Sequence, residues 1–184
     1  MRREKTWLLI LIAALAASVF LNVIQGRQLK VRADLSTDSL SPGVVVSTLK
    51  VKDLSGRYVS LKFDDTTKPT VLYVFAPSCR WCKRNSASMR ALVDQMGQQY
   101  RFIGISLYGG DVQEFLKNSN SGISTYYTDP TDGSVAKYKL FSTPTTLVIS
   151  PEGKVLRFWV GAYVGDTKSE IERFFSVQLP QAGS

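Results

Sequence analysis

Cys79 and Cys82 are the residues of this 184-residue chain best suited to do chemistry, because they lie three positions apart at the expected start of a helix. Free backbone N–H groups and the helix dipole favour a thiolate at the first helical turn. A thiolate attacks disulfides, and a second cysteine one turn later can resolve the mixed disulfide that forms. The spacing therefore predicts a redox pair, with Cys79 as the exposed nucleophile and Cys82 as the more buried resolving thiol.

The composition excludes most other uses of the two cysteines. The chain has no histidine, so it holds no Ser-His-Asp or Cys-His nucleophile pair and no histidine-ligated haem. Two cysteines without histidine do not complete a tetrahedral zinc site unless carboxylates supply the remaining ligands. A passive disulfide across one helical turn would remove little chain entropy. We therefore expect a redox centre that needs no cofactor and no metal.

The segments around the cysteines predict an α/β fold. Residues 70–75 form a continuous apolar run, which is typical of a strand buried on both faces. After the cysteines, Met89, Leu92, Val93 and Met96 recur at helical spacing. The remaining predicted elements are a hairpin over 44–61, strands over 102–107, 124–127, 145–149 and 155–160, and helices beginning at 111, over 134–138 and over 167–175. Strands that alternate with helices imply a mixed central sheet flanked by helices.

The N-terminal region is predicted to be a membrane anchor. Residues 7–24 (WLLILIAALAASVFLNVI) carry no charge and are near the minimum length for crossing a bilayer core. The small-residue pattern at 14–16 keeps a cleaved signal peptide open as the alternative. Three Lys/Arg residues on each side leave the orientation undecided by charge. Because the Met-Arg-Arg start resembles an export signal, we expect a single-pass protein of the bacterial cytoplasmic membrane whose domain faces the periplasm or the outside.

These patterns divide the chain into an anchor (1–25), a linker (26–43), a folded domain (44–177) and a tail (178–184). The net charge is +8, but residues 33–184 hold 17 Lys/Arg and 14 Asp/Glu, so much of the excess flanks the anchor. Cations beside an apolar segment typically meet lipid headgroups. The folded part has no basic run interleaved with aromatic residues. We therefore expect a membrane contact through residues 7–24 and no nucleic-acid partner.

Two motifs carry a family resemblance. Residues 71–82 (VLYVFAPSCRWC) resemble the active-site strand and turn of thioredoxin-like proteins, and residues 141–149 (FSTPTTLVI) resemble their Thr-Pro segment. The leading hairpin, the long interval between the two motifs and the turn at 151–154 are similar to the membrane-anchored TlpA-like subgroup, which includes reductases that serve cytochrome c maturation. The resemblance covers about residues 42–177. It implies a thioredoxin-like mixed sheet with an N-terminal β-hairpin, preceded here by the predicted transmembrane helix.

The resemblance also implies roles for individual residues. Cys79 would be the nucleophile and Cys82 the resolving thiol. Pro144 would be cis and face the cysteines, and Thr143 would offer backbone hydrogen bonds to an extended substrate chain. Trp81 would form part of an exposed apolar rim around the sulfur atoms.

The chain departs from the family pattern at three places. Thioredoxins carry a buried acid where Tyr73 stands, and members that serve cytochrome maturation often carry a glutamate where Asn85 stands. The dipeptide Arg80-Trp81 lacks the usual proline. Without either acid, the proton of Cys82 has no obvious local acceptor. The departures weaken the link to cytochrome maturation more than the redox assignment.

The leading hypothesis is a membrane-tethered, extracytoplasmic thiol-disulfide oxidoreductase of the protein disulfide reductase type. Its partners would be protein thiols or disulfides and an upstream electron donor or acceptor. One alternative is a non-catalytic thioredoxin-like binding module, which the missing acids favour. The other is a peroxiredoxin-like peroxidase, although that chemistry requires a threonine where Ala76 stands.

Overall fold

A computed structural model describes residues 18, 40–46, 48–108 and 110–182. The chain separates into two compact units, 1–38 and 39–184, and the description that follows concerns the second. No helix among the described residues is long and apolar enough to cross a bilayer. The predicted anchor, residues 7–24, lies outside the described residues except for Ser18.

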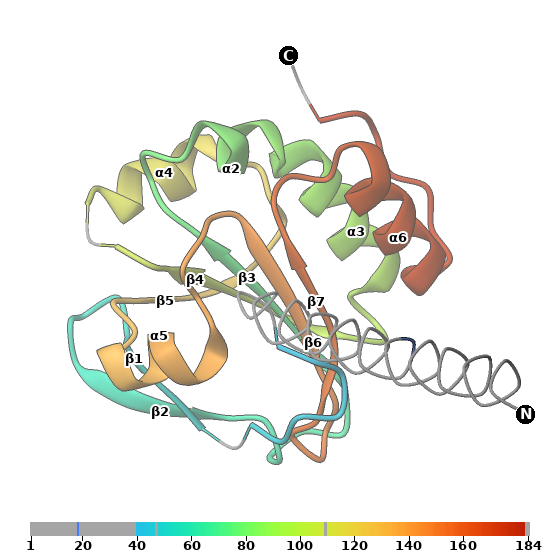
Figure 1. Cartoon of the computed structure of the whole chain (residues 1–184). Helices are drawn as coiled ribbons and strands as arrows, with labels where there is room; N and C mark the ends of the chain where they lie inside the picture. The colour runs from blue at the N-terminus through green and yellow to red at the C-terminus, as the bar shows by residue number, and fades with distance from the viewer. Residues whose placement is uncertain (1–17, 19–39, 47, 109, 183–184) are drawn as a thin grey trace, which may run out of the picture. The chain divides into compact units, whose positions relative to one another are not determined.

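Seven strands form one mixed sheet, and helices cover both of its faces (Figure 1). The strands are β1 (Thr48–Lys52), β2 (Tyr58–Lys62), β3 (Thr70–Phe75), β4 (Arg101–Ser106), β5 (Thr125–Thr128), β6 (Thr145–Ile149) and β7 (Val155–Val160). The helices are α2 (Arg80–Arg84), α3 (Ser86–Met96), α4 (Val112–Asn118), α5 (Asp132–Tyr138) and α6 (Gly165–Phe175). The order across the sheet is β2-β1-β5-β4-β3-β6-β7. The predicted mixed sheet flanked by helices is confirmed.

The central strand β3 pairs with β4 in parallel and with β6 in antiparallel orientation. All six of its residues are buried, as the apolar run predicts. Because side chains alternate along a strand, Val71, Tyr73 and Phe75 pack against α3, α4 and α6 on one face. Leu72 and Val74 pack on the other face, in the core that includes α5.

Helix α4 begins where the sequence supplies a cap. Asp111, where a helix is predicted to begin, accepts a hydrogen bond from Glu114 N at 2.7 Å, and α4 begins at the next residue. On α3, Met89, Leu92 and Met96 are buried and Val93 is partly buried, so the predicted apolar face lies against the sheet.

Residues on both sides of 44–177 also pack on the domain. Leu40, in the predicted linker, is buried, and Gly43 N donates to Val155 O at 2.8 Å. At the other end, Leu179 is buried, and Ser88 Oγ donates to Pro180 O at 3.0 Å. Residues 40–43 and 178–180 therefore pack on the domain, because each segment brings an apolar side chain and backbone groups that hydrogen-bond to it.

Candidate active site

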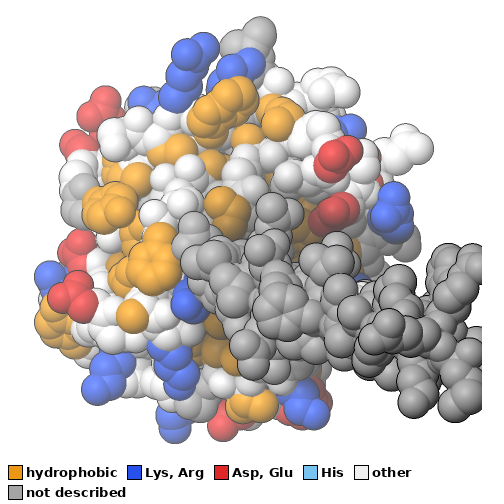
Figure 2. Space-filling model, in the orientation of Figure 1, with side chains coloured by type: hydrophobic (Ala, Val, Ile, Leu, Met, Phe, Trp, Pro, Cys, Tyr) orange, Lys and Arg blue, Asp and Glu red, His pale blue; other side chains and the backbone are white. Residues whose placement is uncertain are grey.

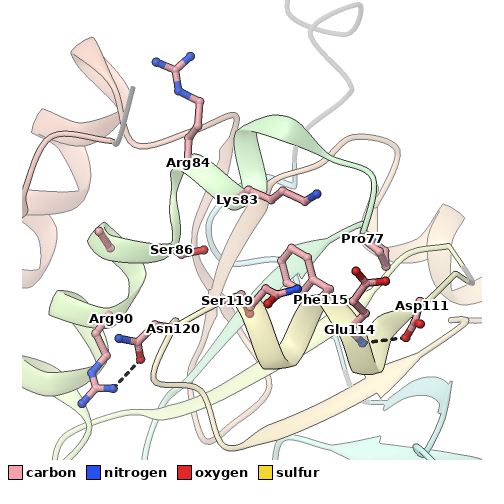
Figure 3. Close-up of a pocket in the computed structure, with 12 residues that line it drawn as sticks. Pro77, Lys83, Arg84, Ser86, Arg90, Asp111, Glu114, Phe115, Ser119 and Asn120 are labelled. Atoms are coloured by element: carbon pink, nitrogen blue, oxygen red, sulfur yellow. Dashed lines mark hydrogen bonds between the residues drawn. The ribbon is translucent and has the colours of Figure 1, made fainter.

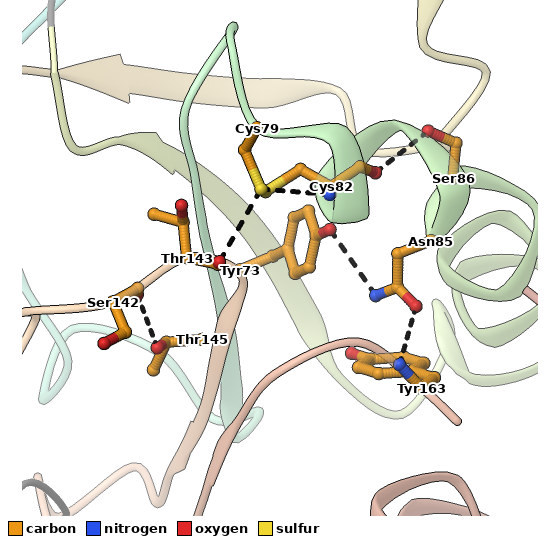
Figure 4. Close-up of a disulfide and its surroundings, with 9 residues drawn as sticks. All are labelled: Tyr73, Cys79, Cys82, Asn85, Ser86, Ser142, Thr143, Thr145 and Tyr163. Carbon is orange, nitrogen blue, oxygen red and sulfur yellow. Dashed lines mark hydrogen bonds between the residues drawn. A yellow bond between two sulfur atoms is a disulfide. The ribbon is translucent and has the colours of Figure 1, made fainter. Parts of the chain in front are cut away.

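Cys79 and Cys82 form a disulfide in the turn that follows β3, with their Cα atoms 5.2 Å apart (Figure 4). Cys79 is the N-cap residue of α2, and its Sγ accepts a hydrogen bond from Cys82 N at 3.1 Å. An N–H group directed at the sulfur favours its thiolate form. Cys79 is partly exposed, whereas Cys82 is 1% exposed. The burial of the two residues therefore follows the order predicted for a nucleophile and a resolving thiol.

The loop before β6 faces the cysteines. Strands β3 and β6 are antiparallel neighbours, and Val74 pairs with Thr145, so the end of β3 and the start of β6 lie at the same edge of the sheet. The peptide bond between Thr143 and Pro144 is cis, as predicted. The carbonyl oxygen of Thr143 lies 3.6 Å from Cys79 Sγ. The topology thus brings together two motifs that are 64 residues apart in the chain.

A buried polar network lies beneath the disulfide. Asn85, which is fully buried, donates from Nδ2 to the Tyr73 hydroxyl oxygen at 3.4 Å and accepts from Tyr163 N at 2.9 Å. The Tyr163 hydroxyl group shares a 2.9 Å hydrogen bond with Thr146 Oγ1. Figure 4 shows the Tyr73 ring below the cysteines, with its hydroxyl group directed toward Asn85. The two positions where the chain lacks the family acids are therefore in direct contact with each other.

The described residues of this network carry no ionisable carboxylate. Burial raises the pKa of Tyr73 far above its usual value, although the hydrogen bond from Asn85 opposes the shift. Burial raises the pKa of Tyr163 in the same way. Both phenols therefore stay protonated throughout the neutral range, and the network beneath Cys82 is electrically neutral.

Exposed aromatic side chains lie next to strand ends at the edge of the sheet that carries the disulfide. Trp81 is 46% exposed, and the Arg84 guanidinium lies over its ring at 4.6 Å from the centroid. Tyr108 follows β4 and is 61% exposed, and Phe141 precedes the cis-proline loop and is 50% exposed. These residues follow or precede strands that meet at one edge of the sheet. An apolar rim of this kind suits contact with another polypeptide.

The structure brings four of the five predicted site residues together, namely Cys79, Cys82, Thr143 and Pro144, and places Trp81 on the exposed rim beside them. It adds Asn85, Tyr163 and Thr146 beneath the site. The sequence marks Asn85 only as a position without the family acid, and no sequence pattern marks Tyr163 or Thr146 as its neighbours.

Comparisons with known proteins agree with this geometry. Residues 42–158 match the model of the AhpC/TSA family. A curated relative from Haemophilus influenzae, named thioredoxin-like protein, is 26% identical over 113 residues, which span 60% of this chain and 65% of that protein.

Solved structures show the same fold. The thioredoxin domain of a thiol-disulfide oxidoreductase from Bacteroides vulgatus has a TM-score of 0.58 at 20% identity, covering 74% of this chain and 99% of that one. A secreted disulfide oxidoreductase from Mycobacterium tuberculosis, homologous to E. coli DsbE, has a TM-score of 0.54 at 21% identity, covering 69% and 93%. The fold of this chain is therefore thioredoxin-like.

Proposed function

Because this chain belongs to the AhpC/TSA family, we propose that it is a thiol-disulfide oxidoreductase that exchanges disulfides with protein partners through Cys79 and Cys82. The observation that carries the proposal is the disulfide itself, which joins a partly exposed and a buried cysteine beside the Thr143 carbonyl group. A disulfide that closes only one helical turn adds little stability. Its position at an aromatic rim suits exchange with another chain.

The exchange proceeds in two balanced steps when the protein acts as a reductase. The Cys79 thiolate attacks one sulfur of a partner disulfide, a mixed disulfide forms, and the other partner sulfur leaves as a thiolate that takes up a proton. The Cys82 thiolate then attacks Cys79 Sγ, which closes the Cys79–Cys82 disulfide and releases the second partner thiol. The partner gains two electrons, and an upstream protein dithiol must return two electrons to the pair. The reverse sequence oxidises a partner.

Trapping tests this proposal. In the full-length chain, Cys82→Ser stops the second step, so a mixed disulfide between Cys79 and its partner should accumulate and disappear on treatment with dithiothreitol. Cys79→Ser is the matched control and should trap nothing. A folded Cys82→Ser protein that captures no partner through Cys79 would falsify the exchange.

Two further assays separate the alternatives. If the chain were a binding module, the Cys79→Ser/Cys82→Ser protein would still bind its partner, and cells that carry it would keep the phenotype of the unmodified chain. If it were a peroxidase, the reduced protein would consume hydrogen peroxide at a rate that depends on Cys79. We expect cells with the double variant to lose the phenotype of the unmodified chain. We expect no peroxide consumption, since Ala76 stands where peroxidase chemistry requires a threonine.

We also propose that residues 7–24 tether the domain to the outer face of the bacterial cytoplasmic membrane. The uncharged 18-residue run supports this assignment. Alkaline carbonate should leave the protein in the membrane pellet, and a C-terminal reporter that works only outside the cytoplasm should be active. Release by carbonate, or a reporter active only in the cytoplasm, contradicts this topology.

A further inference from the structure

The turn that carries the disulfide is cationic. Helix α2 holds Arg80, Lys83 and Arg84, and no Asp or Glu occurs between Asp65 and Asp94. Arg80 and Lys83 are exposed, and neither forms an ion pair with a residue that the structure describes. Arg84 lies over the Trp81 ring. Figure 2 shows Lys and Arg side chains, in blue, beside hydrophobic ones at the top of the molecule, where Figure 1 places α2.

A cleft of about 780 Å³ begins at this turn and runs between α2–α3 and α4 (Figure 3). Pro77, two residues before Cys79, and Lys83, next to Cys82, line its near end. Phe115 gives it an apolar surface. Ser119 lies at the same cleft, and its buried hydroxyl group has no hydrogen-bond partner among the described residues. The cleft therefore offers apolar and hydrogen-bonding surface to a segment that leaves the disulfide.

The two walls of the cleft carry opposite charges near the turn. Figure 3 shows Lys83 extending over the cleft from one wall, while Asp111 and Glu114 project from α4 on the other. Arg90 is already bound to Asp94 at 2.8 Å and to Asn120 at 3.0 Å. Lys83 thus extends from the wall that follows the cysteines, and the carboxylates of Asp111 and Glu114 lie on the opposite wall. An acidic side chain is favoured next to the disulfide and disfavoured along α4.

We infer that the protein partner carries acidic residues immediately beside its reactive cysteine, where they contact Arg80 and Lys83. The inference rests on the proposed exchange function and names the partner's chemistry. Charges at the rim of a contact act mainly on the association rate, and salt screens them. The preference should therefore appear as a salt-dependent rate of the first exchange step.

Three peptide probes test the inference with the full-length, reduced chain. Each probe has one cysteine joined through a disulfide to nitrothiobenzoate, and the residues on both sides of the cysteine are glutamate, glutamine or lysine. Attack by Cys79 on the peptide sulfur releases coloured nitrothiobenzoate, and Cys82 then releases the peptide thiol. Rates with dithiothreitol alone correct for the intrinsic reactivity of each probe.

At low ionic strength we expect the glutamate probe to react about tenfold faster than the lysine probe, with glutamine between them. The ratio should approach one at about 1 M salt. Lys83→Gln and Arg80→Gln should each lower the glutamate-to-lysine rate ratio several-fold, and Lys83→Glu should reverse the preference. Lys137→Glu, on α5 at the other face of the sheet, is the control and should leave the ratio unchanged.

The outcomes separate the two proposals. If the reduced chain releases nitrothiobenzoate from no probe, the exchange function fails. If all three probes react at equal corrected rates, or if Lys137→Glu changes the ratio as much as Lys83→Glu, exchange stands and the acidic-partner inference is overturned.

Discussion

Asn85 joins two parts of the candidate site through one side chain. It follows the cysteine helix α2, and its carboxamide bonds to Tyr73 on β3 and to Tyr163 in the loop before α6. That loop is also held by Gly161 N, which donates to Pro144 O at 2.8 Å. Asn85 therefore links the cysteine turn to the loop that supports the cis-proline. An amide serves this purpose because it donates and accepts without ionising.

The neutral network predicts a simple pH dependence for the exchange reaction. Because burial raises the pKa of Tyr73, its phenol stays protonated through the neutral range. We expect the rate of the reduced protein to rise with pH through one ionisation, that of Cys79. Asn85→Asp should add a second ionisation, since a buried carboxyl has a raised pKa. It should also lower the free energy of unfolding at neutral pH by about 1–3 kcal/mol.

A pH–rate profile with a peptide disulfide measures both ionisations. Gln98→Glu places a carboxyl at an exposed position after α3, outside the cleft, and should leave the profile unchanged. Two ionisations in the unmodified protein, or one in Asn85→Asp, contradicts the assignment of a neutral network beneath Cys82.

At the scale of elements, the domain depends on segments that close its edges as well as on the sheet. Residues after α6 return to that helix, where the Glu172 carboxylate accepts from Leu179 N at 2.8 Å and pairs with Lys168 at 2.9 Å. These interactions hold the pKa of Glu172 below its usual value, with the backbone hydrogen bond from Leu179 as the largest cause. Buried Leu179 is thereby kept against the α3–α6 core.

Glu172→Gln should therefore destabilise the domain at neutral pH and have less effect in acid. A pKa that is lower in the folded than in the unfolded state gives stability that is present above the unfolded pKa and is lost as pH falls through the folded pKa. Urea unfolding at pH 7 and at about pH 3 should show a difference in unfolding free energy between the unmodified chain and Glu172→Gln, and this difference should be smaller in acid. Asp94→Asn removes an exposed carboxylate that pairs with Arg90 of the same helix, and it should cause a smaller loss of stability at neutral pH. A difference in unfolding free energy between the unmodified chain and Glu172→Gln that grows in acid would contradict this role of the Glu172 carboxylate.

For the molecule as a whole, sequence patterns predicted the elements better than their surroundings. Alternation and apolar runs identified β3 and β6, and helical spacing identified α3, because burial imposes those periods on the sequence. The Asn85–Tyr163 contact joins residues 78 positions apart, which no local period encodes. The packing of residues 40–43 and 178–180 is not predicted for a related reason. Leu40 and Leu179 each stand alone among polar residues and prolines, so neither belongs to an apolar pattern. The position of Lys83 opposite Asp111 and Glu114 likewise depends on how α2 and α4 face each other.

The buried tyrosines limit the stability of the whole domain at high pH. Burial raises the pKa of Tyr73, Tyr138 and Tyr163, so each phenol stays neutral in the folded state. In the unfolded chain a tyrosine ionises at about pH 10. A raised folded pKa gives stability that is present below the unfolded pKa and is lost as pH rises above it. Each of the three should remove about 1.4 kcal/mol of unfolding free energy per pH unit above about pH 10, or about 4 kcal/mol together.

Tyr138→Phe isolates one of these contributions, because the buried Tyr138 hydroxyl group has no hydrogen-bond partner among the described residues. At neutral pH the variant should be as stable as the unmodified chain or more stable by about 1 kcal/mol, since an unsatisfied buried group is removed. Above about pH 10 its stability should decline less steeply, by about 1.4 kcal/mol per pH unit. Tyr163→Phe is the matched comparison: it should show the same shallower decline but lose stability at neutral pH, because Thr146 Oγ1 loses its partner. Denaturant unfolding across this pH range, followed together with tyrosinate absorbance, measures the slopes. Full tyrosine ionisation with the fold intact is the result that contradicts burial of these three phenols.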